Sequence, residues 1–222
     1  MTFQRTRRPR RARPGSLRSP DGARLLQLAA TSDAPDATVL LLHGGKDGTS
    51  RATAPGWWPP VLRMRPIGSS VRRSPQTPRL ATYLLVDELR SWNGGEPPVR
   101  DASWAIAQLR QANPDTPIVL VGHSMGGRVA IRVIGAEGVV GAVGLAPWLP
   151  SGEPVPDLTD RRLVLLHGTA DKIIPVRYSE DWAERAGVEL RIIAGGDHSM
   201  LRPLPTWHRM TGEAVAEVLR GG

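Results

Sequence analysis

The sequence predicts an α/β fold in which helices cover both faces of a mostly parallel central sheet. Two observations predict this class. Short apolar runs alternate with segments of helical periodicity along the 222 residues, as in βαβ units. Several of these runs are apolar throughout, which is typical of strands that are buried on both faces. The length and the 40% hydrophobic composition suit a single domain over residues 21–222.

The strands are expected where apolar runs meet turn residues. The segment Ala23–Leu28 follows Ser19-Pro20-Asp21-Gly22, a turn sequence, and is expected to form an edge strand. The remaining strands are expected at Val39–Leu42, Ala81–Val86, Ile118–Val121, Val139–Leu145, Leu163–Leu166 and Glu189–Ala194.

Helices are expected between these strands. Apolar residues at helical spacing predict helices at Val99–Asn113, Ser124–Ala136, Arg177–Ala186 and Thr206–Leu219. Gly187 suits the C-terminal end of the third of these helices. The segment Trp57–Arg73 contains three prolines, so a short or broken helix is expected there.

Residues 1–20 are expected to form a basic, flexible arm. Residues 1–24 carry eight Arg and one Asp, which accounts for most of the formal net charge of +8. Such a basic stripe can attract nucleic acid or an anionic membrane. Because the arm has almost no aromatic side chains to stack on bases, we favour a solvated arm over a nucleic-acid partner.

Several protein classes are excluded by composition. The chain has no cysteine, which excludes a disulfide framework, a thiolate zinc site and a cysteine nucleophile. The arginine pairs of the arm are followed by Pro, Gly and Ser, so a secretory signal is not expected. No apolar run approaches the roughly 20 residues that span a bilayer. We expect a cytoplasmic protein without membrane association, and no metal site among the five histidines.

The segment Gly122-His-Ser-Met-Gly126 carries the first chemical signal. It follows an apolar strand and precedes a helical stretch, and it has the pattern G-x-S-x-G. A serine on a sharp strand-to-helix turn has a strained backbone, and side chains at the two glycines would collide with neighbouring backbone. Ser124 is therefore the candidate nucleophile, although an ordinary glycine-rich turn would produce the same pattern.

A second glycine-rich turn follows the strand that ends at Leu42. It reads His43-Gly-Gly-Lys46, and a free backbone N–H there can face the nucleophile. Together with the N–H of Met125, the N–H of Gly45 is the candidate donor to an oxyanion. His43 is interpreted as a structural histidine that holds the turn.

An acid and a base follow two later strands. Asp171 ends the segment Leu163–Asp171, and His198 ends the segment Ile192–His198. A serine hydroxyl needs a base within hydrogen-bond reach, and the base needs a carboxylate to fix its tautomer. All three groups follow the C-terminal ends of strands, where open α/β sheets bind ligands. We therefore predict a Ser124–His198–Asp171 triad.

Other polar residues are weighed against this triad. Asp197 adjoins His198, but sequence neighbours rarely have the geometry to pair, so Asp171 is preferred. Asp87 is expected to cap a turn. His123 and His167 are expected to pack or to bond backbone, and His208 is expected to be exposed on the last helix.

The motifs GHSMGG, HGG, HGTAD and GDH, in this order, resemble those of the α/β-hydrolase superfamily from about Thr38 onward. The resemblance implies Ser124 as nucleophile, His198 as base, Asp171 as acid, and Gly45 and Met125 as oxyanion donors. The stretch Leu85–Gly94 lacks the family's usual wording, and residues 1–37 carry no family motif.

The expected activity is that of a cofactor-independent serine hydrolase acting on a small-molecule ester or thioester. Only the proline-rich residues 147–161 separate two strands where many such enzymes insert a lid, so we predict an open site. Trp148, Leu149 and Trp92 are expected to form an apolar substrate pocket with Lys46 near it, and Trp57 and Trp58 are expected to overhang the cleft. Two alternatives stay open: an acyltransferase on the same site, and a non-catalytic scaffold with an idle triad.

Overall fold

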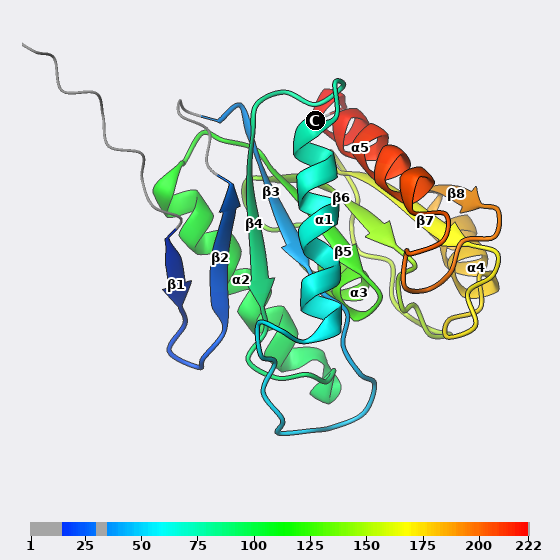
Figure 1. Cartoon of the computed structure of the whole chain (residues 1–222), viewed down its shortest axis with the longest axis horizontal. Coiled ribbons are helices and arrows are strands. Elements are labelled where there is room, and N and C mark those ends of the chain that lie inside the picture. The colour runs from blue at the N-terminus through cyan, green and yellow to red at the C-terminus, as the bar shows by residue number, and fades with distance from the viewer. Residues whose placement is uncertain (1–14, 30–34, 222) are drawn as a thin grey trace, which may run out of the picture.

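A computed structural model describes residues 15–29 and 35–221 of the chain. It contains an eight-stranded sheet (Figure 1). The strands are Ser16–Arg18 (β1), Arg24–Ala29 (β2), Ala37–Leu42 (β3), Leu80–Val86 (β4), Ile118–His123 (β5), Val139–Leu145 (β6), Arg162–Gly168 (β7) and Glu189–Ile193 (β8). Their order across the sheet is β1-β2-β4-β3-β5-β6-β7-β8.

Six of the eight strands run parallel to one another, from β4 through β3 to β8. Strand β2 runs in the opposite direction and pairs antiparallel with both β4 and β1, and β1 forms the edge of the sheet on this side. The predicted mostly parallel sheet is thus confirmed, and every predicted strand is present. Strand β1 is an addition, because it lies within the segment assigned to the arm. Residues 1–14, which hold most of the arm, lie outside the described residues.

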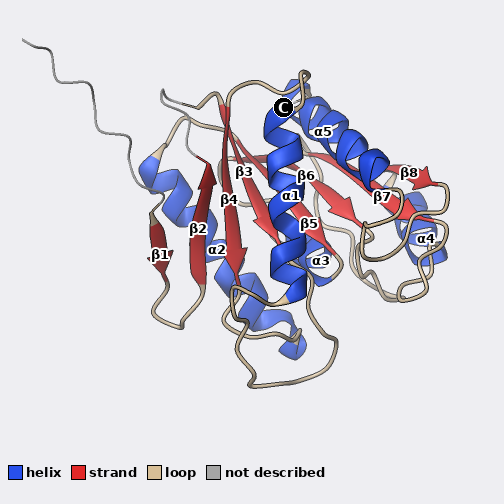
Figure 2. Cartoon of the chain, in the orientation of Figure 1, coloured by secondary structure: helices blue, strands red, loops and turns tan. Residues whose placement is uncertain are grey.

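Five α-helices and one short 3-10 helix cover the sheet. They are Pro59–Arg73 (α1), Asn93–Gly95 (η1), Glu96–Ala112 (α2), Met125–Arg132 (α3), Arg177–Ala186 (α4) and Leu204–Arg220 (α5). Figure 2 shows α1 and α5 on one face of the sheet and α2, α3 and α4 on the other. A separate apolar core lies under each of these two layers, as expected for helices that each bury one apolar side.

A short or broken helix was expected between Trp57 and Arg73, and this prediction was wrong, because α1 is continuous over 15 residues. Its two leading prolines occupy the first turn, where backbone N–H groups need no helical partner. Pro66 lies inside the helix and removes one hydrogen bond. The buried face, which includes Val61, Met64 and Val71, holds the helix against the sheet in spite of this loss.

Helix α3 is shorter than predicted. It begins at Met125 and ends at Arg132, so Ser124 stands just before its first turn. The connection from β6 to β7 contains no helix, as predicted for a protein without a lid. The ends of β5, β7 and β8 lie along the same edge of the sheet because these strands are parallel. Within residues 15–29 and 35–221, no helix combines the length and apolarity needed to cross a bilayer.

Candidate active site

Ser124 occupies a sharp turn between β5 and α3. Its φ of 54° lies in the left-handed region, which side-chain-bearing residues rarely adopt, and its amide donates to the carbonyl of Leu145 at 3.0 Å. The flanking glycines permit this turn. A Cβ at Gly122 would overlap the carbonyl of Gly126, and a Cβ at Gly126 would overlap the carbonyl of Leu42. The turn therefore depends on both glycines of the G-x-S-x-G pattern.

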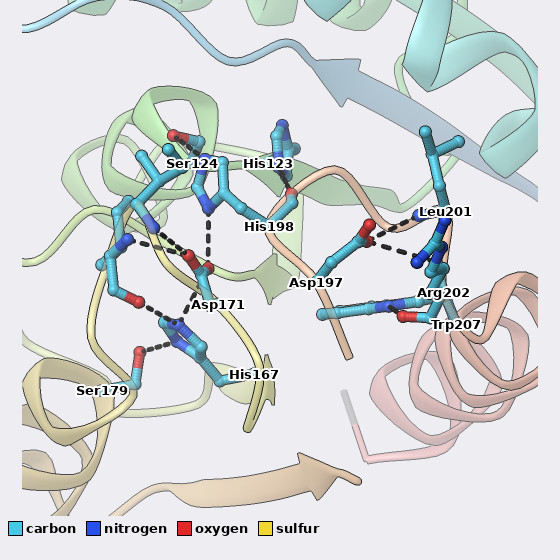
Figure 3. A network of polar contacts seen from close by, with 12 residues as sticks. His123, Ser124, His167, Asp171, Ser179, Asp197, His198, Leu201, Arg202 and Trp207 are labelled. Carbon is cyan, nitrogen blue, oxygen red and sulfur yellow. Dashed lines mark hydrogen bonds and ion pairs between the residues drawn. The ribbon is translucent and has the colours of Figure 1, made fainter. Parts of the chain in front are cut away.

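The structure brings Ser124, His198 and Asp171 together at the edge of the sheet (Figure 3). The distance from His198 Nε2 to Ser124 Oγ is 3.1 Å, and the distance from His198 Nδ1 to Asp171 Oδ2 is 2.7 Å. These contacts require a hydrogen on Nδ1, which leaves Nε2 free to accept the serine proton. The three residues come from the ends of β5, β7 and β8, far apart in the sequence.

The carboxylate of Asp171 is fully buried and ionised. Its Oδ1 accepts hydrogen bonds from the backbone N–H groups of Ile173 and Ile174, both at 2.8 Å. Burial by itself raises the pKa of Asp171, but hydrogen bonds from His167 and His198 and from the Ile174 amide outweigh it and hold the pKa well below its usual value. A negative charge is therefore maintained next to the imidazole of His198.

Asp197, the alternative acid, faces away from this arrangement. Its Oδ1 accepts hydrogen bonds from the amides of Leu201 and Arg202, at 2.8 and 3.2 Å (Figure 3). Asp197 therefore stabilises the loop that follows His198. The preference for Asp171 agrees with this geometry.

The turn at residues 43–46 packs against the serine. A Cβ added at Gly44 would lie 3.3 Å from Ser124 Cβ, and one at Gly45 would overlap the Met125 side chain. In the described part of the chain, the amides of Gly45 and Met125 donate to no acceptor. Both N–H groups therefore remain available to a ligand at this turn.

His43 is buried under this turn and is neutral. Desolvation lowers its pKa to about 4. The ring Nδ1 donates to the carbonyl of Gly44 at 2.7 Å, and Nε2 accepts from the amide of Asp87 at 3.1 Å. This is the structural role predicted for His43. Asp87 itself lies buried at the end of β4, where burial raises its pKa well above the usual value.

His123 connects the serine turn to the histidine loop. Its Nε2 donates to the backbone carbonyl of His198 at 2.7 Å, as Figure 3 shows. Burial, together with repulsion from His198, lowers the pKa of His123 to about 3. The ring is therefore neutral and bonds backbone, in agreement with the prediction.

The predicted substrate pocket is only partly present. Trp92 and Trp148 contact edge-to-face, with ring centroids 5.8 Å apart. The amide of Trp148 donates to the carbonyl of Ser124 at 3.0 Å, so the backbone of Trp148 lies next to the serine turn. Leu149 was wrongly assigned to the pocket, because it is only 1% exposed and packs in the core under α2, α3 and α4.

The other residues of the predicted pocket differ from one another. The Lys46 side chain is exposed, while its backbone pairs with Arg90 and Trp92. Trp58 was expected to overhang the cleft, but it is buried edge-to-face against His43. Trp57 is 70% exposed. Trp92 is as buried as Trp58 and belongs to the core under α2, α3 and α4, whereas Trp148 is half-buried.

The contacts that His167 and Arg128 make near the site were not predicted. The ring Nε2 of His167 lies 3.3 Å from Asp171 Oδ2 and donates to the carbonyl of Ile174 at 3.0 Å, while Nδ1 accepts from the Ser179 hydroxyl at 2.7 Å. The HGTAD motif contains His167, and its i,i+4 spacing to Asp171 was the available signal. Among residues the structure describes, no group of three or more His, Asp or Glu side chains could hold a metal ion.

Arg128 makes the second set of unpredicted contacts. Its guanidinium carbon lies 4.0 Å from the ring centroid of Trp92 and 4.6 Å from that of Trp148, so a cation–π contact reinforces the aromatic pair. Arg128 and Arg132 both form ion pairs with the buried carboxylate of Glu153. No motif in the sequence marks this long-range pairing.

The parallel sheet and the serine at its strand-to-helix turn define the class of serine hydrolases with an α/β fold. A family model described as an alpha/beta hydrolase domain matches residues 96–219, which is more than half of the chain. The chain belongs to the α/β hydrolase family. A search of curated protein sequences finds no match.

Solved structures share the fold at low sequence identity. An alpha-beta serine hydrolase homologue from Coxiella burnetii is 13% identical, with a TM-score of 0.72 and coverage of 90% of this chain and 96% of that chain. A lidless α/β serine hydrolase from Xanthomonas campestris is 16% identical, with a TM-score of 0.67 and coverage of 96% and 97%. Est1E from Butyrivibrio proteoclasticus is 12% identical, with a TM-score of 0.64 and coverage of 93% and 99%.

Proposed function

We propose that the protein hydrolyses carboxylic esters or thioesters of small molecules through an acyl-enzyme on Ser124. The observation that carries this proposal is the continuous contact from Ser124 Oγ through the His198 ring to the Asp171 carboxylate. Neither a binding scaffold nor a structural serine requires a base and an ionised acid in this order. A serine at the positive-φ turn is also strained, which a purely structural role would not explain.

In the first half of the reaction, Oγ of Ser124 attacks the substrate carbonyl while His198 Nε2 takes its proton. The negative charge that develops on the carbonyl oxygen faces the N–H groups of Gly45 and Met125. The bond to the leaving oxygen or sulfur then breaks, and the leaving group takes the proton from His198 Nε2. Asp171 stabilises the imidazolium that exists between these two transfers.

In the second half, water attacks the acyl-enzyme. His198 takes a proton from the water, the acyl–Oγ bond breaks, and Ser124 recovers its proton from His198. The absence of a helical insertion between β6 and β7 favours substrates that reach the site directly from solvent. The half-buried Trp148, whose backbone lies next to the serine turn, favours an apolar or aromatic substituent on the substrate.

Labelling with a fluorophosphonate probe, together with hydrolysis of p-nitrophenyl acetate, tests this proposal. Ser124→Ala should abolish labelling and lower kcat/KM by at least about 10⁴-fold, because the nucleophile is removed. Ser151→Ala, which changes an exposed serine of the β6–β7 connection, is the matched control and should keep both activities. Folded wild-type protein that neither labels nor hydrolyses any ester or thioester would contradict the proposal. Labelling without hydrolysis would indicate an acceptor other than water.

A further inference from the structure

A pocket of about 340 Å³ lies between α1, the loop after His198 and the beginning of α5. The lining is mostly apolar and includes Pro59, Leu62, Ile67, Met200, Leu201 and Leu204. Leu62, Leu201 and Leu204 are 45%, 61% and 38% exposed, so an apolar rim faces solvent. We call it the α1–α5 pocket. Large exposed apolar side chains that surround a concave site are typical of a ligand-binding surface.

The α1–α5 pocket adjoins the loop that carries His198. It shares Ser199 with a second hollow of about 410 Å³, which is lined by His198 together with Lys172, Asp197 and Arg202. Ser199 and Met200 are also the two residues that follow His198 in the chain. The α1–α5 pocket therefore lies on the side of the site that the His198 loop forms.

The proton transfers identify which part of a substrate lies on that side. The leaving oxygen or sulfur must be within hydrogen-bond reach of His198 Nε2 to take its proton. The carbonyl oxygen instead faces Gly45 and Met125, at the turn after β3. The substituent of the leaving group thus starts next to His198, whereas the acyl group starts on the side of Ser124 and the neighbouring Trp148.

We propose that the α1–α5 pocket binds the apolar chain of the leaving alcohol or thiol, so that the preferred substrates are esters or thioesters of aliphatic alcohols or thiols. This inference rests on the proposed function. The volume is near the lower end of the range of about 300–1,000 Å³ for small-molecule sites, which suits a short to medium chain. Arg63 and His208 are polar members of the lining and are both half-buried.

A series of acetate esters of ethanol, butanol and hexanol tests the proposal. The acyl group is constant, so every substrate forms the same acyl-enzyme and only the leaving chain changes. We expect kcat/KM to rise about fourfold for each added methylene that is fully buried, from the burial of apolar surface. A flat or falling series from ethyl to hexyl acetate would overturn the proposal. A preference for chain length that appears only when the acyl chain is varied, in the methyl esters of acetate, butanoate and hexanoate, would also overturn it.

Two variants locate the preference in this pocket. In Leu62→Ser/Leu201→Ser, which removes two exposed apolar side chains, the ratio of kcat/KM for hexyl to ethyl acetate should fall towards one. Ile192→Ser is the matched control, because Ile192 is 44% exposed on β8 and lines neither hollow, and it should keep the wild-type ratio. An unchanged ratio in the double variant, with a melting temperature close to that of the wild type, would overturn the assignment.

Failure of the proposed function would give a different result. In that case the wild type hydrolyses no ester and Ser124 is not labelled, whereas failure of this inference alone leaves hydrolysis without a leaving-chain preference. Saturation-transfer NMR of 1-hexanol with Ser124→Ala measures the pocket without turnover. Binding that disappears when Leu62→Ser/Leu201→Ser is added supports the pocket, and no binding, or binding that survives the added substitutions, contradicts it.

Discussion

The ring of His167 is fully buried and positions the acid of the site. Its Nε2 lies near Asp171 Oδ2, the same oxygen that accepts the hydrogen bond from His198 Nδ1 (Figure 3). The Ser179 hydroxyl bonds the other ring nitrogen of His167. Because the Ile174 carbonyl and the Asp171 carboxylate can only accept, Nε2 carries a hydrogen, which leaves Nδ1 to accept from the Ser179 hydroxyl. His167 thus acts on the reaction through Asp171 without touching the substrate.

His167→Gln should lower kcat for p-nitrophenyl acetate by about 10- to 100-fold, with a smaller change in KM. The reason is the loss of a hydrogen bond to a charged group, which is worth about 1.5–3 kcal/mol. Steady-state kinetics of the folded variant measure the effect. Ser179→Ala removes only the bond that orients the ring, so its effect should be smaller. A wild-type kcat in His167→Gln would show that Asp171 is held by its backbone contacts alone.

At the level of single residues, the sequence predicts the groups whose chemistry is specific. A serine between two spaced glycines, and an acid and a histidine after later strands, were sufficient to choose Ser124, Asp171 and His198. The burial of Leu149 could not be predicted, because an apolar residue after a strand can face either the core or the cleft. The Arg128–Trp92–Trp148 contact depends on segments that meet only in the folded chain.

Glu153 ties the connection from β6 to β7 to two helices. Its carboxylate pairs with Arg128 and Arg132 on α3, and its carbonyl accepts from Trp182 and Arg185 on α4. Burial raises the pKa of Glu153, but the two arginines outweigh it and lower the pKa below its usual value. A stretch of coil is thereby fixed beside the nucleophile.

Glu153→Gln should destabilise the protein by about 2–3 kcal/mol. This is somewhat less than the value for breaking a fully buried ion pair, since Arg132 is partly exposed. Urea unfolding followed by tryptophan fluorescence measures the change. Glu137→Gln is the matched control, because its pair with Arg110 has an 88% exposed carboxylate and should contribute less than about 1 kcal/mol. Equal losses in the two variants would contradict a special role for Glu153.

The type of each helix and strand was predicted better than its length. Apolar runs located every strand of the parallel part because burial on both faces requires them. The length of helix α1 was underestimated. The sequence shows that Pro66 disfavours a helix, but it does not show the apolar contacts that the buried face of α1 makes with the sheet. Strand β1 was missed because it is short, exposed and polar in part, and it exists through pairing with β2.

On the scale of the whole molecule, the two cores enclose neutral histidines. His43 and His123 are fully buried, and their pKa values are lowered to about 4 and about 3 by desolvation. In the unfolded chain, histidine titrates near pH 6.5. Below that pH the unfolded state binds protons that the folded state does not, so the free energy of unfolding falls as the pH falls.

We therefore expect the two histidines to decrease the free energy of unfolding by about 4 kcal/mol between pH 7 and pH 5, and the raised pKa of Asp87 to offset part of this decrease. The decrease is about 1.4 kcal/mol per pH unit for each of the two histidines below pH 6.5. The paired carboxylate of Asp171 adds to this loss only below about pH 4, where its unfolded form takes up a proton. Urea unfolding at the two pH values measures the effect. His43→Gln should roughly halve it, and a pH-independent stability would contradict the prediction.

The bond from the His123 ring to the His198 carbonyl has a mechanical consequence. His123 directly precedes the nucleophile, so one side chain couples the backbone of the hydroxyl-bearing turn to the backbone of the base. When the loop after β8 moves, the serine turn moves with it. Ser124 Oγ and His198 Nε2 therefore keep their separation during thermal motion. The hydrogen bond from His123 maintains the alignment of Ser124 and His198 whether or not a ligand is bound.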